Sequence, residues 1–309
     1  MNISIIGIWH LGSVTSACLA NFGHNILCVD DDKNLIKKLK NNVLPIYEPG
    51  LAEMTKKYYS SGKINYSHNF SDISQSEIVW ICYDTPVDEN DNANVEFVIN
   101  KINKAILSMK KNTNIIISSQ IPIGTTNRIK IQNENLIKKN NLSFAYIPEN
   151  LRLGNSLRIF KNPDRVIVGI DSKNSKKIIN QVYGKIRNRI IWMSVESAEM
   201  TKHAINSFLA CSVVFINELA SICEVSGADA MEVEKGLKSE KRIGPYAYLK
   251  PGTAFAGGTL ARDIKFLINK GKDLKIEPVL FEAILKSNNN HKDWIKNKIN
   301  LISKNNRIK

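Results

Sequence analysis

The first two thirds of the chain alternate between short apolar runs and stretches with helical periodicity. The apolar runs are rich in Ile and Val and end at turn residues, which is typical of buried strands. Strands are predicted at 3–6, 25–30, 78–82, 114–118, 143–146, 165–170 and 189–192, with helices at about 10–20, 93–109, 127–139 and 175–182. This alternation predicts an α/β fold with a doubly wound, mostly parallel sheet. Ligands would then lie beyond the carboxyl ends of the strands.

A different pattern begins after residue 193. From Val195 to Val225 neither Gly nor Pro interrupts a mostly apolar run, which predicts one helix of roughly 45 Å. Ser194 is a suitable N-cap, and Gly227 would end the helix. Further helices are predicted at about 230–237, 260–270 and 278–302, with a Gly- and Pro-rich loop at 244–258. We therefore predict a sheet domain at 1–193 and an all-helical domain at 194–309 built on the long central helix.

Three polar residues of the long helix fall on one face. Lys202, Asn206 and Asn217 lie within about 60° of one another at helical spacing. The remaining positions are largely apolar, so we expect the helix to be buried on most sides. The three residues then form either a buried functional face or an incidental solvent-facing one.

The residues around the first predicted turn are similar to a dinucleotide-binding fingerprint. Gly7 and Gly12 occupy its first and third glycine positions, and Asp30 ends the second strand. In this motif pyrophosphate lies at a helix N-terminus and the acidic residue binds the ribose hydroxyls. Trp9 replaces the second glycine, and its bulk would displace the backbone from pyrophosphate or change the turn. The alternative is a βαβ unit that binds no nucleotide.

The acidic residues at the end of the second strand favour NAD over NADP. Asp30 would accept hydrogen bonds from ribose hydroxyls and repel a 2′-phosphate. Asp31 and Asp32 would add to that repulsion.

The composition limits the classes of molecule that the protein is expected to bind. A net charge of +14 is compatible with nucleic acid, a membrane surface or a small anionic substrate. The lysines are spread over predicted helix faces and loops, which favours the small substrate over nucleic acid or membrane. Five cysteines without C-x-x-C spacing and five scattered histidines predict no metal site. With no basic leader and no sufficiently long apolar run, we expect a cytoplasmic protein.

Taken together, the motifs resemble those of the nucleotide-sugar 6-dehydrogenase family, the UDP-glucose and GDP-mannose dehydrogenases, from residue 1 to about 300. The matching stretches are 7–12, 47–51, 85–86, 122–126, 148–152, 163–165, 198–210, 215–218 and 252–263. The resemblance implies a Rossmann-like domain, NAD as cofactor, a nucleotide-sugar substrate and a homodimer formed through the long helix.

The family oxidises a sugar C6 alcohol to a carboxylate with two NAD, through an aldehyde and a cysteine-bound thioester. By matching position, Lys202 and Asn206 correspond to residues that hold the reacting oxygen, and Asp263 to the aspartate that holds the catalytic water. Glu149 corresponds to the first glutamate of the family's P-E-F-L-R-E-G loop. We expect the cofactor beside Gly7, Trp9, His10, Leu11, Gly12, Asp30, Thr85, Pro86, Ser119 and Arg262, and the substrate beside Glu149, Leu151, Lys202, Asn206, Phe255 and Gly257.

The chain also departs from the family pattern. Thr259 stands where the cysteine nucleophile belongs, Leu153 at the second glutamate of the loop, and Gln120 at a threonine. The chain stops where the family's third domain would begin. The catalytic candidates are therefore Lys202, Asn206, Asp263, Thr259, Gln120 and Glu149.

Three functions remain open. The first is an NAD-dependent oxidoreductase limited to two-electron interconversion of alcohol and aldehyde, which the retained Lys202, Asn206 and Asp263 favour. The second is a catalytically silent NAD- or sugar-nucleotide-binding homologue. The third is a four-electron dehydrogenase with an unusual nucleophile.

Overall fold

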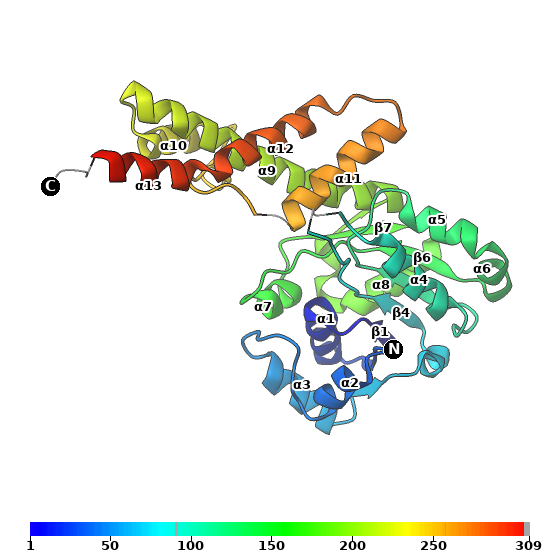
Figure 1. Ribbon diagram of the computed structural model, residues 1–309. Helices are drawn as coiled ribbons and strands as arrows, with labels where there is room; N and C mark the ends of the chain where they lie inside the picture. The colour runs from blue at the N-terminus through cyan, green and yellow to red at the C-terminus, as the bar shows by residue number, and fades with distance from the viewer. Residues whose placement is uncertain (90–91, 257, 306–309) are drawn as a thin grey trace. The chain divides into compact units, whose positions relative to one another are not determined.

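The computed structural model describes residues 1–89, 92–256 and 258–305. The chain forms two compact units (Figure 1). The sheet unit comprises residues 1–86 and 94–200, and the helical unit comprises residues 87–93 and those from 201 onward. The boundary at 200 lies inside the long helix, seven residues beyond the predicted domain boundary at 193.

The sheet unit is built on eight strands. Their order is β3 (Ile64–Ser67), β2 (Asn25–Val29), β1 (Asn2–Ile6), β4 (Ile78–Ile81), β5 (Asn114–Ile117), β6 (Ser143–Tyr146), β7 (Val166–Ile170) and β8 (Ile190–Met193). Neighbouring strands are parallel except β6 and β7, which are antiparallel. The predicted doubly wound, mostly parallel sheet is therefore confirmed. Every residue of β4 is buried, because helices cover both faces of a sheet of this kind.

The helices of the sheet unit are α1 (His10–Asn21), α2 (Lys33–Lys40), α3 (Leu51–Ser60), α4 (Val95–Ile106), α5 (Thr125–Gln132), α6 (Glu134–Asn140), α7 (Ser156–Lys161) and α8 (Lys173–Tyr183), with 3-10 turns η1 (Phe70–Gln75) and η2 (Gly184–Arg189). Helix α1 is buried from Leu11 to Ala20, because it packs against β1 and β2 and contacts α3 and α7. The sequence pattern missed β3, α2, α3 and α7. Helix α2 shows why: it is rich in lysine and buries only Ile36 and Leu39, too few positions to reveal a period.

Two predicted helices are each divided in two. The stretch at 127–139 is α5 and α6, separated at Asn133, whose side-chain amide donates to the Ile129 carbonyl and thus ends α5. The stretch at 278–302 is α12 (Val279–Lys292) and α13 (Trp294–Asn305), separated at Asp293. Apolar periodicity continues across both breaks, so the pattern alone predicted single helices.

The helical unit is arranged along α9 (Val195–Ser226), which residues 195–200 share with the sheet unit. Ser194 Oγ accepts a hydrogen bond from the Ser197 N–H at 3.1 Å, and Gly227 follows the helix with φ +81°, so both predicted ends are confirmed. Helices α10 (Ala230–Ser239), α11 (Thr259–Asp273), α12 and α13 complete the unit. Its core is a cluster of Ala210, Val214, Ile264, Ile268 and Ile284.

The burial of α9 differs from the expectation in both directions. Lys202, Asn206 and Asn217 are all buried, so the interpretation as incidental solvent-facing residues is wrong. By contrast, the side chains of Phe208, Phe215 and Ile222 are 73%, 51% and 59% exposed, so the helix is not buried on most sides. The pattern did not show this because apolar side chains occupy both faces.

Candidate functional site

The predicted dinucleotide-binding turn lies where the strand order of the sheet reverses. The chain leaves β1 and returns as β2 on one side, whereas β4 lies on the other. Gly7 follows β1, Asp30 follows β2 and Tyr83 lies two residues after β4, so these residues share the carboxyl edge of the sheet. In doubly wound sheets this switch point is where ligands bind.

Two glycines are required by the backbone of this turn. Gly7 has φ +89°, and a Cβ built on it would lie 2.8 Å from Tyr83. A Cβ on Gly12 would lie 2.0 Å from the Gly7 carbonyl oxygen. Because no side chain fits at either position, the spacing serves close packing of the turn against α1 and β4.

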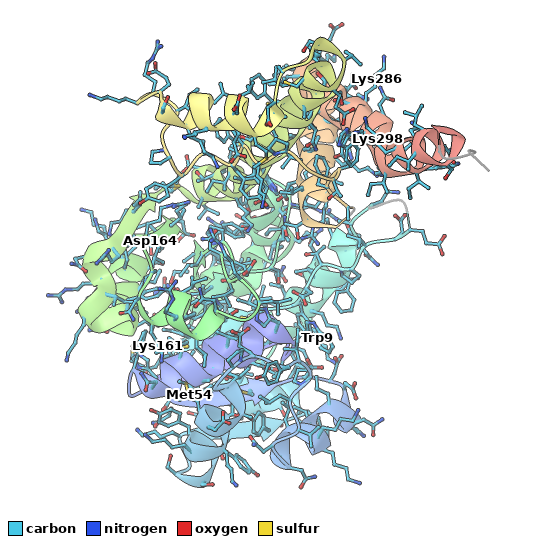
Figure 2. All side chains as sticks on the ribbon, turned by 90° about the vertical axis from the view of Figure 1, so that its left-hand side faces the viewer. Trp9, Met54, Lys161, Asp164, Lys286 and Lys298 are labelled. Carbon is cyan, nitrogen blue, oxygen red and sulfur yellow. The ribbon has the colours of Figure 1, made fainter. Side chains whose placement is uncertain are left out.

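Trp9 takes the second glycine position without strain. Its φ is −99°, which does not require glycine, and its side chain is half exposed at the start of α1 (Figure 2). No side chain caps α1, and its first turn has no acidic residue. The helix N-terminus therefore presents backbone N–H groups to an anion, as a pyrophosphate site requires.

Two buried hydroxyls near the same edge lack partners among the described residues: Tyr83 Oη, against the glycine turn, and Ser119 Oγ, after β5. Buried polar groups are normally hydrogen-bonded, so unpaired hydroxyls in this position fit a polar ligand. The residues of the turn therefore fit a dinucleotide such as NAD.

Asp30 is oriented by backbone donors. Its Oδ2 accepts from the Ile8 N–H at 3.0 Å and its Oδ1 from the Asp32 N–H at 3.1 Å. Each carboxylate oxygen can accept a further bond, so Asp30 keeps capacity for ribose hydroxyls.

The two neighbouring acids have partners of their own in the structure. Asp32 caps α2 by accepting from the N–H groups of Asn34 and Leu35. Asp31 forms ion pairs with Lys101 and, at 3.8 Å, with Lys104. The negative charge of Asp31 is thus compensated by lysines, which reduces its expected repulsion of a 2′-phosphate.

The His10 side chain belongs to a buried network. Its Nε2 lies 3.3 Å from Glu48 Oε2 and 3.0 Å from Ser156 Oγ. Glu48 also accepts from the N–H groups of Ser156, at 2.8 Å, and Gly154, at 3.0 Å. Burial opposes ionisation of Glu48, but these donors prevail and lower the pKa of its carboxyl. The network ties the glycine turn to the loop before α7, so the imidazole of His10 has a structural role here.

The loops after β4, β5 and β6 meet within the sheet unit. Thr85 Oγ1 donates to the Gln120 carbonyl at 2.5 Å, which joins the stretch ending at Pro86 to the loop after β5. After β6, Glu149 accepts from the Leu151 N–H. Leu11, Glu149 and Leu151 line a small cavity of about 70 Å³. The structure therefore brings several predicted cofactor and substrate residues to this edge.

Glu199 is a buried acidic residue of α9 whose contacts the sequence interpretation did not predict. It is fully buried and accepts from Gly124 N–H at 2.6 Å, Thr126 N–H at 3.0 Å and Thr126 Oγ1 at 2.6 Å. It thus caps α5, whose preceding Gly124 has φ +87°. Burial raises the pKa of Glu199 despite these donors. An acidic residue in a largely apolar helix, one turn before Lys202, was the available signal.

In the helical unit, Asp263 of α11 joins two residues of α9. Its carboxylate is fully buried, accepts from the Asn206 side-chain amide and lies 2.8 Å from His203 Nδ1. His203 packs edge-on against Phe266, with ring centroids 5.2 Å apart. Lys202 is also buried, on the same turn of α9. Sequence reasoning missed His203, although it lies three residues before Asn206 and so on the same side of the helix.

The loop before α11 is held by two buried asparagines. Asn217 accepts from the Gly252 N–H at 2.9 Å and donates to the Thr253 carbonyl. Asn288 bonds both backbone groups of Phe255 at 2.9 Å. Asn217 is therefore buried for loop positioning. Thr259 and Arg262 follow on α11, with Thr259 exposed, whereas the predicted Gly257 lies outside the described residues.

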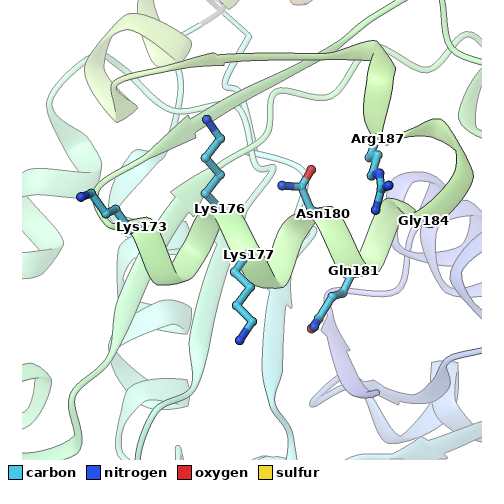
Figure 3. A pocket seen from close by; sticks show the side chains of 7 residues that line it. All are labelled: Lys173, Lys176, Lys177, Asn180, Gln181, Gly184 and Arg187. Carbon is cyan, nitrogen blue, oxygen red and sulfur yellow. The ribbon is translucent and has the colours of Figure 1, made fainter.

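A basic groove lies on α8 and η2 (Figure 3). It has a volume of about 530 Å³ and is lined by Lys173, Lys176, Lys177, Asn180, Gln181, Gly184 and Arg187. The sequence from 172 to 193 contains no Asp or Glu. The positive charge is thus less evenly spread than expected, but none of the predicted cofactor or substrate residues lines this groove.

Comparisons with known proteins agree with this geometry. Residues 1–187 match the NAD binding domain of the UDP-glucose/GDP-mannose dehydrogenase family, and residues 196–290 match its central domain. A UDP-glucose 6-dehydrogenase of Bacillus subtilis is 30% identical over 300 residues, covering 96% of this chain and 68% of the relative. One of Rickettsia bellii is 32% identical over 305 residues, covering 97% and 69%.

A solved UDP-glucose dehydrogenase structure from Pyrobaculum islandicum superposes with a TM-score of 0.83 at 26% identity, covering 93% of this chain and 68% of that one. The chain thus spans about two thirds of the length of these relatives. With both domain models matched in order along a fold that carries the dinucleotide turn, the chain belongs to the UDP-glucose/GDP-mannose dehydrogenase family, whose members are NAD-dependent dehydrogenases that act on sugar nucleotides.

Proposed function

We propose that this protein oxidises one CH–OH group of a nucleotide sugar with NAD and stops at the aldehyde, a two-electron reaction that is reversible. The observation that carries this proposal is the buried network of Asn206 and Asp263 beside Lys202. Burying several polar and ionisable groups is costly unless they are paired. Their retention therefore supports a functional role for the residues that serve the first oxidation.

The first oxidation needs few protein groups. NAD bound at the glycine turn would supply the hydride acceptor for the alcohol carbon. The hydroxyl proton must leave as the C–O double bond forms, and the oxygen needs hydrogen-bond donors while its charge develops. We assign oxygen binding to Lys202 and Asn206. Asp263 holds the Asn206 amide through the bond between them and is a positioning residue in this assignment.

The side chains that a second oxidation would require are missing from the matching positions. A thioester requires a nucleophile that ionises near neutral pH, and a threonine hydroxyl needs an adjacent base. Thr259 is exposed, and no described side chain hydrogen-bonds to its hydroxyl. Leu153, 65% exposed, cannot activate water as a carboxylate would. These replacements support arrest at the aldehyde.

The test is the number of NADH formed per sugar consumed, measured with UDP- and GDP-hexoses. One NADH per sugar supports the proposal, and two would establish a four-electron dehydrogenase. NAD or sugar-nucleotide binding without turnover would favour the silent homologue. Thr259→Cys combined with Leu153→Glu is expected to move the count toward two, and Thr259→Ser with Leu153→Gln is the matched control.

We also propose a homodimer formed through α9. Phe208, Phe215 and Ile222 recur every seven residues and are largely exposed, which gives the helix one uncovered apolar stripe. By length and composition alone, α9 could cross a membrane. Its polar residues Lys202, His203 and Asn206 are buried, which indicates a helix that packs within a fold. A second copy offers the same stripe, as a two-fold interface requires. Sedimentation showing a monomer at micromolar concentration would contradict this.

A further inference from the structure

A cluster of two lysines and one aspartate borders the dinucleotide turn. Asp31 directly follows the ribose-binding candidate Asp30. Its carboxylate is bonded to Lys101 Nζ and lies 3.8 Å from Lys104 Nζ, and both lysines come from α4. The side chain of Lys101 is only 19% exposed, so its ammonium group is more restricted than an ordinary surface lysine.

Aromatic rings hold both lysines in place. Lys101 Nζ lies 5.5 Å from the centroid of the Tyr83 ring and 5.2 Å from that of Phe97, and these rings pack edge to face. Lys104 Nζ lies 4.5 Å from the centroid of Phe70. Such cation–π contacts favour a fixed position for the ammonium groups. Because Tyr83 is also the residue that a Gly7 side chain would strike, the cluster adjoins the turn itself.

Two cations beside the ribose-binding carboxylate are the arrangement that accepts a ribose 2′-phosphate, since a basic residue at this place accommodates that group in NADP-binding proteins. In this chain both lysines are instead paired with the carboxylate of Asp31. Burial opposes the ionisation of Asp31, but the hydrogen bond and charge of Lys101 prevail and lower the pKa of its carboxyl.

We propose that Asp31 is a specificity-determining residue, which preserves selectivity for NAD by holding Lys101 and Lys104 in ion pairs and so withholding them from a 2′-phosphate. Asp30 then favours the ribose hydroxyls of NAD. Asp31 prevents the two adjacent lysines from favouring the 2′-phosphate of NADP. The proposal rests on dinucleotide binding alone and not on the oxidation chemistry proposed above.

The test measures binding by calorimetry at low salt, with NAD and NADP and with 5′-AMP and adenosine 2′,5′-bisphosphate as probes without nicotinamide. Asp31→Asn keeps the size of the side chain and removes its charge. It is expected to tighten the binding of NADP and the bisphosphate by up to about fivefold, the upper value for one exposed ion pair, while the affinity for NAD and 5′-AMP changes less than about twofold. This gain in affinity for NADP and the bisphosphate should become smaller at about 0.5 M salt, because exposed charge interactions are screened.

Three further variants make the result specific. Adding Lys101→Met to Asp31→Asn is expected to abolish most of the gain, and Lys101→Met alone should weaken NADP further. Glu134→Gln removes the carboxylate of another exposed ion pair of the sheet unit, the one with Lys138. It should leave the ratio of the affinities for NADP and NAD unchanged. An unchanged ratio in Asp31→Asn, an equal shift in Glu134→Gln, or a gain that survives Lys101→Met would overturn the proposal. Because no turnover is measured, failure here is separate from failure of the proposed reaction.

Discussion

Glu199 offers the sharpest test of how α9 is joined to the start of α5. Its buried carboxylate accepts three hydrogen bonds at the start of α5, two from Thr126 and one from Gly124. Glu199→Ala leaves these donors without an acceptor, and an unpaired buried donor costs about 1–3 kcal/mol. With water entering the vacated space, we expect a loss of about 3–5 kcal/mol in the free energy of unfolding. Thr126→Val removes only the hydroxyl and should cost about 1 kcal/mol.

The pH dependence of this group has a definite sign. Burial raises the folded pKa of Glu199 above its ordinary value of 4.5. A raised pKa means that the folded protein favours the protonated carboxyl, so its stabilising contribution is complete below 4.5 and is lost as pH rises through the folded pKa. Relative to Glu199→Gln, which does not titrate, the wild type should therefore gain stability as the pH falls from neutral toward 4.5.

Urea unfolding followed by tryptophan fluorescence is a suitable assay, because Trp80 and Trp192 both lie in the sheet unit. The expected order of stability is wild type, Thr126→Val, then Glu199→Ala. A loss below about 1 kcal/mol for Glu199→Ala would refute the capping role. A stability difference from Glu199→Gln that does not vary with pH would refute the account of its ionisation.

Other predictions concern the turn, the stripe and the buried histidine. Gly12→Ala should abolish NAD binding in calorimetry or unfold the sheet unit, because its Cβ would lie 2.0 Å from the Gly7 carbonyl oxygen; normal binding would contradict the geometry. Trp9→Gly should tighten NAD binding if the indole limits access to the helix N-terminus, and weaker binding would instead assign the ring to the cofactor. Phe215→Asp should convert dimers to folded monomers in sedimentation, since this side chain is 51% exposed, whereas loss of the circular dichroism signal would mean that it packs internally. His203→Phe should lower kcat much more than it raises KM, because it disturbs the Asp263 carboxylate that holds Asn206; an unchanged kcat would exclude that coupling.

Local pattern was sufficient for much of the fold. The strands and the mostly parallel sheet followed from short apolar runs that are buried on both faces. The ends of α9 followed from an N-cap at Ser194 and a left-handed glycine at 227. The glycine turn followed from the absence of space for a Cβ at Gly12. The motifs were likewise sufficient for the family, because they occur in a fixed order along the chain. Where periodicity ran on past a local signal, as at Asn133, prediction from the pattern was wrong.

Tertiary structure decided which polar groups act together. Glu199 meets Gly124 across 75 residues, Glu48 meets Ser156 across 108, and Asp263 meets His203 across 60. It also decided that Asp31 faces Lys101, 70 residues away, which changed an expected source of repulsion into an ion pair. The physical reason is that periodicity reports whether a side chain is turned toward a core or toward solvent. The partner of a buried charge or an exposed apolar face depends on elements brought together only by folding.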